Sequence, residues 1–161
     1  MEILYSLDTI ISLLIFSFII ITLYLGIKVV PQSMVFVIER FGKYSKTLNA
    51  GLNIIVPYLD KVAHRVSILE RQLKEFTISV ISKDNVEVKL ETTVFYRVVD
   101  ASRSVYRIRD VQSAINTAAT SIVRSAAGRL ELDDLQSSRD SMNEEISKNL
   151  QQAAEVWGIE I

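Results

Sequence analysis

The sequence predicts an α+β domain, in which helices pack on an antiparallel β-sheet, behind an N-terminal transmembrane helix. Three observations predict this. Residues 9–27 form an uncharged apolar run, residues 86–98 alternate with the period of a strand, and residues 111–126 repeat apolar side chains with the period of a helix. Because strand signals precede helical ones, sheet and helices are expected to form separate layers of one domain.

The apolar run is TIISLLIFSFIIITLYLGI, which is long enough to cross a bilayer. Its 19 residues would reach about 28 Å as a helix, against about 30 Å for the hydrocarbon core. A cleaved signal peptide is the alternative, but Glu2 and Asp8 precede the run and no A-x-A site follows it. We therefore predict a short extracytoplasmic N-terminus over residues 1–8 and a transmembrane helix over residues 9–30.

Basic residues flank only the C-terminal side of this run. Residues 1–27 hold no Lys or Arg, whereas Lys28, Arg40, Lys43 and Lys46 follow it. The positive-inside rule then predicts a single-pass protein of the plasma or inner membrane. Its domain, residues 31–161, would face the cytoplasm or an equivalent compartment such as a mitochondrial matrix. The absence of cysteine agrees with a reducing compartment.

Strand signals fill the first part of this domain. Residues 34–40 are β-rich, residues 47–51 indicate a turn, and residues 61–69 alternate. Residues 76–98 predict an antiparallel hairpin with its turn at residues 82–85 and one buried face. The second strand of this hairpin would bury Val86, Val88, Leu90, Thr92, Val94, Tyr96 and Val98.

Two helices are predicted after residue 100. The first has apolar residues at helical spacing from Val111 to Ala126, with Asp110 as its N-cap and Gly128 at its end. The last runs from about Ser141, where Ser141 and Glu144 have the spacing of a capping box, and ends at Gly158.

A second apolar stretch, LNIIVPYL at residues 52–59, is too short to span a bilayer. One interpretation is a wedge that dips into the interfacial zone of the leaflet; a buried core strand is the alternative. The predicted membrane contacts are Leu52, Ile54, Ile55, Val56, Pro57, Tyr58 and Leu59.

Basic residues surround this stretch and are candidate contacts for anionic headgroups, at about 1 kcal/mol per residue near the surface. Solvated charge is the alternative. These residues are Arg40, Lys43, Lys46, Lys61 and Arg65.

Charge is unevenly distributed along the chain. Residues 28–129 hold 16 basic and 9 acidic residues, net +7, and residues 130–161 hold 2 and 8, net −6. Such complementary regions suit a head-to-tail contact between copies, which closes into a ring when the rotation allows; an acidic solvated helix is the alternative. The candidate oligomer contacts are Arg103, Arg107, Arg109, Arg124, Asp133, Asp134, Glu144 and Glu145.

The residues for catalysis are scarce. The chain has no cysteine and one histidine, His64, which lies in an alternating strand pattern and is expected to be structural. It contains no P-loop, no G-x-G-x-x-G and no G-x-S-x-G elbow. We therefore predict no enzyme activity, no cofactor and no metal, and the basic region lacks an aromatic RNA-binding signature, so nucleic acid is not an expected partner.

Three segments carry a resemblance to a known family. They are VPQSMVFVIERFGKYSKTLNAGLNIIVPYLDKV at residues 30–62, ISKDNVEVKLETTVFYRVVD at 81–100, and SIVRSAAGRLELDDLQSSRDSMNEEISKNLQQAAEVWGIEI at 121–161. Together they resemble the stomatin, prohibitin and flotillin superfamily, whose shared domain is called SPFH or band 7. The bacterial stomatin-like, or paraslipin, branch is the most similar.

The resemblance implies a non-enzymatic membrane scaffold that forms homo-oligomeric rings or cages, organises membrane microdomains and associates with membrane proteases or channels. A regulatory subunit of one membrane protease or channel, without rings, is the alternative, and a hydrolase is a more distant one. Similar proteins continue into a further strand and a coiled-coil segment. A chain ending at Ile161 is therefore expected to lack part of their lateral contact.

Overall fold

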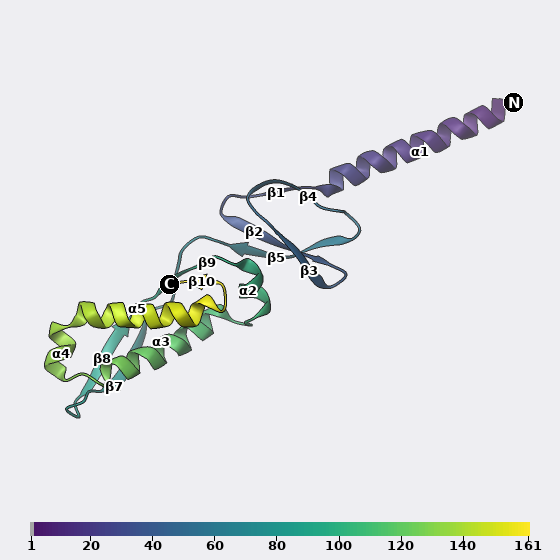
Figure 1. Ribbon diagram of the computed structural model, residues 1–161. Helices are drawn as coiled ribbons and strands as arrows, with labels where there is room; N and C mark the ends of the chain where they lie inside the picture. The colour runs from purple at the N-terminus through teal and green to yellow at the C-terminus, as the bar shows by residue number, and fades with distance from the viewer. Residues whose placement is uncertain (1) are drawn as a thin grey trace. The chain divides into compact units, whose positions relative to one another are not determined.

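The computed structural model describes the backbone of residues 2–161 and the side chains from Asp8 onward, and it confirms the α+β class (Figure 1). The described chain divides into two compact units, one ending at Arg65 and one beginning at Val66. Each unit has its own hydrophobic core.

The first unit is one long helix followed by five strands. The elements are α1 (Glu2–Gly26), β1 (Ile27–Val30), β2 (Met34–Arg40), β3 (Lys43–Leu48), β4 (Gly51–Ile54) and β5 (Asp60–Ser67). Strand β2 lies between β3 and β5, and β1 pairs with β4 in a separate antiparallel ribbon. Residues 35–38 of β2 are all buried, because this strand is central in its sheet. The core of the unit consists of Val30, Phe36, Ile38, Leu48 and Ile55.

The predicted end of the transmembrane helix at residue 30 is wrong. Helix α1 ends at Gly26, and residues 27–30 form β1 instead. The reason is tertiary, since Ile27 and Val30 pair with Ile54 and Gly51 of β4, which the local sequence does not reveal. The helix still has a stretch, Asp8–Gly26, that is long and apolar enough to cross a membrane.

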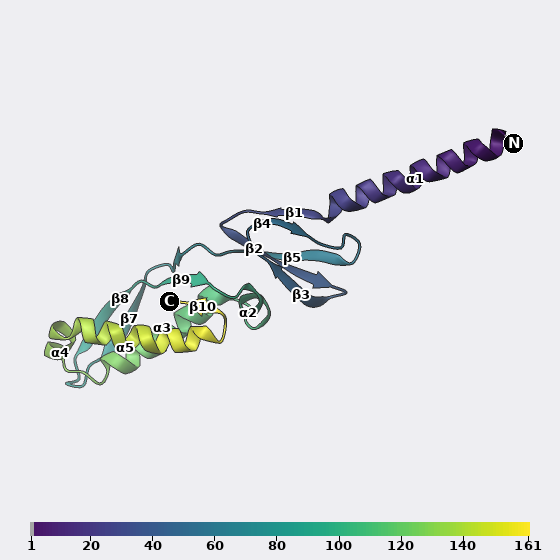
Figure 2. The same ribbon diagram turned by 45° about the horizontal axis from the view of Figure 1, so that its top comes forward.

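The second unit packs helices against short antiparallel sheets. Its strands are β6 (Arg71–Gln72), β7 (Phe76–Ile81), β8 (Glu87–Thr92), β9 (Phe95–Val98) and β10 (Ile159–Glu160). Its helices are α2 (Ala101–Tyr106), α3 (Val111–Ala127), α4 (Leu132–Ser137) and α5 (Arg139–Glu155). Figure 2 shows α3 and α5 side by side. Buried Ala119 of α3 and buried Ala154 of α5 belong to one core cluster, and these small side chains permit a close approach.

The predicted hairpin of this unit is confirmed, because β7 and β8 pair from Phe76↔Thr92 to Ile81↔Glu87. Its second strand breaks after Thr92 and resumes as β9, which pairs with β6 and β10. Asp110 is confirmed as the N-cap of α3, since its carboxylate accepts from the N–H groups of Gln112 and Ser113.

The predicted start of the last helix at Ser141 is wrong. Helix α5 begins at Arg139, with Ser138 in the N-cap position, so Ser141 is already inside it. The six-residue helices α2 and α4 were not predicted, because so few residues show no helical period.

Candidate membrane-contact surface

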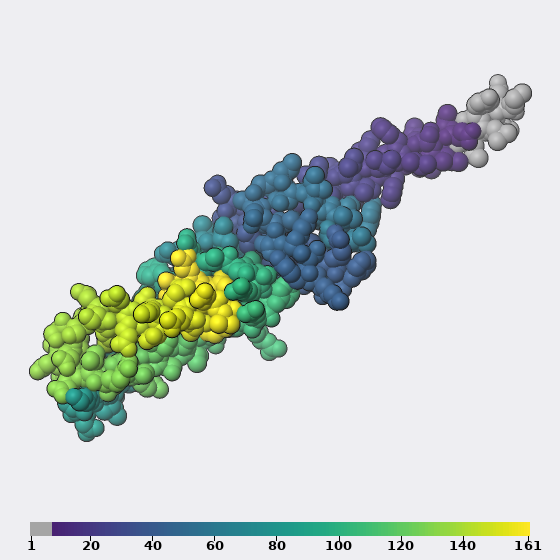
Figure 3. Space-filling view, viewed as in Figure 1, coloured from purple at the N-terminus to yellow at the C-terminus, as the bar shows by residue number. Residues whose placement is uncertain are grey.

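Helix α1 carries apolar side chains on all sides. From Asp8 to Leu25 nearly every one of them is exposed within the chain. The space-filling view shows this helix extending from the strands of its own unit (Figure 3). An exposed apolar helix of this length requires an apolar environment, which a bilayer provides.

The β1–β4 ribbon extends this apolar surface beyond the helix. Ile27 lies opposite Ile54, and Val29 lies opposite Leu52. Because side chains alternate along a strand, these two pairs share one face, and all four side chains are 46–72% exposed. The other face carries Val30, which is buried. Ile27 and Val29 were missed as site residues, because residues 27–30 were assigned to the helix.

The predicted wedge, residues 52–59, is half strand and half turn. Leu52 and Ile54 lie on the exposed face of β4, and Val56, Tyr58 and Leu59 are exposed in the following loop. Ile55 is only 5% exposed and packs in the core of the unit. The prediction that Ile55 contacts the membrane is therefore wrong, because its side chain points into the sheet. Pro57 is half-buried in the loop.

Tyr58 joins this loop to α1. Its ring stacks on the ring of Phe18, with centroids 6.1 Å apart and an interplanar angle of 3°. Its hydroxyl lies 3.3 Å from Oγ1 of Thr22. Phe18 lies eight residues before Gly26, or about 12 Å along the helix. The loop therefore lies alongside the last two turns of α1, and helix, ribbon and loop form one apolar surface.

Asp60 joins the two ends of this loop through hydrogen bonds to the backbone of Val56. Its carboxylate accepts from Nε and Nη2 of Arg40, at 2.7 and 3.2 Å, and from the backbone N–H of Val56 at 2.9 Å. The backbone N–H of Asp60 donates to the carbonyl of Val56 at 2.9 Å. The Arg40 guanidinium, and then the Val56 N–H, lower the pKa of Asp60. The side chain of Asp60 is 0% exposed, so this ion pair fixes the shape of the loop.

Three of the predicted headgroup contacts also interact within the unit. Arg40 is engaged with Asp60, Lys46 donates to the carbonyl of Ile54 at 3.0 Å, and Arg65 lies 5.2 Å from the ring centroid of Phe36. All three therefore help to stabilise the unit. They are nevertheless exposed, as Lys43 and Lys61 are, and all five residues stay candidates for headgroup contact.

The predicted oligomer contacts divide in the same way. Arg103 pairs with Asp100, Glu145 pairs with Arg129, and Arg107 donates to the carbonyl of Val156. The remaining residues are exposed and form no ion pair with any other residue that the structure describes. They are Arg109, Arg124, Asp133, Asp134 and Glu144.

His64 lies exposed on β5. Within residues 8–161, whose side chains the structure describes, no three His, Cys, Asp or Glu side chains are grouped to hold a metal ion.

An apolar helix that continues into an apolar ribbon and loop defines a membrane-associated α+β protein. Residues 28–161 match the model of the SPFH domain / Band 7 family, and the chain belongs to that family.

Curated relatives from distant organisms share this domain. The chain is 38% identical over 133 residues to an uncharacterized protein of Schizosaccharomyces pombe, which covers 83% of this chain and 38% of the relative. It is 33% identical over 130 residues to the mitochondrial stomatin-like protein 2 of Homo sapiens, covering 81% and 36%. An uncharacterized protein of Mycobacterium tuberculosis is 30% identical over 136 residues, covering 84% and 36%. The chain thus spans little more than a third of the length of these relatives.

Proposed function

We propose that this protein is a membrane-anchored scaffold of the stomatin type, which assembles with copies of itself and organises the bilayer and the membrane proteins around it. The observation that carries the proposal is the continuous apolar surface of α1, the β1–β4 ribbon and the loop with Tyr58. Membership of the SPFH family supports it.

In this proposal α1 spans the bilayer, and the rest of the chain lies on the cytoplasmic side. The ribbon and the loop enter the leaflet at which α1 ends, because Ile27 follows Gly26 directly and Tyr58 packs beside Thr22. Each copy then inserts more material into one leaflet than into the other. Repeated around an assembly, this asymmetry would set the packing of the enclosed lipids.

Self-assembly is proposed from the exposed charges of the second unit. Arg109 and Arg124 on one copy would face Asp133, Asp134 or Glu144 on the next, since these residues have no ion-pair partner among the described side chains. A heterologous contact of this kind builds rings. A membrane protease or another integral membrane protein is the proposed client of the assembly.

Two measurements test the proposal. The first is the mass of the full chain in mild detergent, where a scaffold gives a large particle or a ladder of oligomers. A single complex of fixed ratio with one membrane protein would favour the alternative, a regulatory subunit.

Charge reversal tests the proposed contact between copies in the same mass measurement. Glu144→Lys should lower the oligomer yield, and Arg124→Glu in the same chain should restore it. Lys148→Glu is the control, because Lys148 is exposed on the same helix. Unchanged yield in the Glu144→Lys variant would exclude this contact.

The second measurement tests the loop. Trp157 is the only tryptophan, so a Trp157→Phe background allows a single reporter at Tyr58→Trp. In vesicles this reporter should be quenched by lipids that carry nitroxide groups on their acyl chains. A Val156→Trp reporter, on an exposed position of the second unit, should be quenched far less. Equal quenching of the two reporters would exclude insertion of the loop.

A further inference from the structure

Phe41 is more exposed than any other large apolar side chain among those the structure describes, including those of α1. It is 81% exposed and stands at the tip of the β2–β3 hairpin, where Arg40 pairs with Lys43. Burial in the fold therefore does not account for an aromatic ring at this position. One exposed apolar side chain is common on protein surfaces and by itself indicates no contact, so a second observation at this position is needed.

The backbone at this tip makes the choice of residue more unusual. The connection between β2 and β3 has two residues, Phe41 with φ 52° and Gly42 with φ 76°. Two-residue hairpins with positive φ at both positions favour Asn, Asp or Gly, and a bulky side chain is strained there. Phe41 therefore contributes neither to the packing of the core nor to the stability of the turn. Strained positions of this kind are often found where a residue contacts a ligand or a partner.

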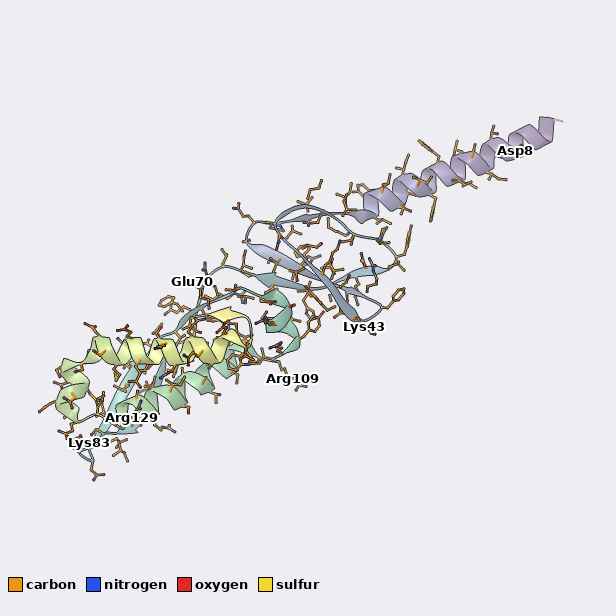
Figure 4. The ribbon with its side chains drawn as sticks, in the orientation of Figure 1. Asp8, Lys43, Glu70, Lys83, Arg109 and Arg129 are labelled. Carbon is orange, nitrogen blue, oxygen red and sulfur yellow. The ribbon has the colours of Figure 1, made fainter. Side chains whose placement is uncertain are left out.

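The position of Phe41 follows from the residue before it. Arg40 forms the ion pair with Asp60, and Asp60 closes the loop that carries Tyr58. Tyr58 in turn packs on Phe18 of α1. The hairpin tip is therefore bonded to the loop that lies alongside the apolar helix. Figure 4 labels Lys43 at this tip.

We propose that Phe41 is an additional membrane contact, whose ring enters the interfacial layer of the leaflet beside the loop of Tyr58. The inference rests on the proposed attachment of the protein to the membrane. Its neighbours suit that layer, since Lys43 and Tyr44 are exposed and the interface favours aromatic rings flanked by basic side chains. The lysine would meet anionic headgroups. The link of this tip to the loop beside α1, through Arg40, Asp60 and Tyr58, favours lipid over a second copy as the occupant.

The test places a tryptophan at position 41 in the full chain with Trp157→Phe, in vesicles that contain phosphatidylglycerol. Nitroxide lipids should quench Phe41→Trp several-fold more than Val156→Trp. A separate reporter leaves Phe41 in place: the chain has no cysteine, so Lys43→Cys carries a single spin label. Oxygen, which concentrates in lipid, should relax this label more than a water-soluble nickel complex does.

Quenching at position 41 decides this inference, and quenching at Tyr58→Trp decides the proposed loop contact. If position 58 is quenched and position 41 is not, the inference is wrong and the proposed function stands. If position 41 is shielded from iodide equally in detergent and in vesicles, without quenching by nitroxide lipids, its partner is a second copy and the inference is again wrong. Should Phe41→Trp fail to fold by circular dichroism, the spin label at position 43 gives the decision.

Discussion

The guanidinium of Arg40, at the end of β2, donates two hydrogen bonds to the buried carboxylate of Asp60, at the start of β5. The same carboxylate accepts the backbone N–H of Val56. One ion pair thus joins the sheet of the first unit to the loop that carries Tyr58. It explains how a loop with exposed apolar side chains keeps a defined shape.

Replacement of Asp60 by Asn should loosen this loop. The amide retains the size of the carboxylate but loses its charge, so the Arg40 guanidinium would keep at most one weaker, neutral acceptor. We expect faster proteolysis between residues 55 and 60 and a lower melting temperature in detergent. Asp140→Asn is the matched control, because Asp140 is exposed and forms no described ion pair. Identical proteolysis of both variants would contradict the role of Asp60.

The pH dependence of this contribution follows from the lowered pKa of Asp60, whose main cause is the hydrogen bond from Arg40. The folded state holds the proton less tightly than the unfolded state, in which the carboxyl has a pKa of about 3.9. The stabilisation is therefore fully present above that pH and is lost as pH falls through the folded pKa. The difference in melting temperature between wild type and Asp60→Asn should stay constant from neutral to mildly acidic pH and shrink below about pH 4. A difference in melting temperature that grows as the pH falls would contradict the predicted direction of this pH dependence.

Gly26 should not tolerate a side chain. A Cβ at this position would lie 2.9 Å from the carbonyl oxygen of Ile55, and the N–H of Ile55 donates to the carbonyl of Gly26 at 2.8 Å. Gly26→Ala should therefore displace the loop and cost about 1–3 kcal/mol of stability, as overpacking does. Unfolding in detergent measures the loss, with Ser17→Ala on the exposed face of α1 as the control. A loss no greater than that of the control would show that the two segments do not touch.

Phe41 should be a site where stability and membrane contact oppose each other. Phe41→Asn places a residue that accepts positive φ at the hairpin tip, which should raise the free energy of unfolding in detergent by about 1 kcal/mol. Phe95→Asn is the control, because Phe95 is exposed but lies in β9. It should be neutral or destabilising. A Phe41→Asn variant less stable than wild type would show that the ring supports the fold.

Much of the second unit was predictable from the sequence. The alternation of residues 86–98 predicts their buried face, and Val94 and Tyr96 are buried as expected. The prediction is wrong for Val86, which is exposed because it follows the hairpin turn directly. Asp110 was recognisable as an N-cap because an N-cap acts on its own local backbone. Helix α2 has the same local signal, since the carboxylate of Asp100 accepts from the N–H groups of Ser102 and Arg103, but its six residues are too few to show a helical period. Helices α4 and α5 begin without a side-chain cap, so their starts were not predictable.

The candidate membrane-contact surface was likewise predictable only in part. The sequence by itself determined that α1 is apolar throughout and that residues 52–59 are unusually apolar for so short a segment, because composition is a local property. Only the tertiary structure decided that Ile55 faces the core while Ile54 faces outward, that β1 pairs with β4, and that Arg40 binds Asp60. These features depend on which strands pair and on contacts between residues about 20 or more positions apart, and the local sequence does not specify such partners.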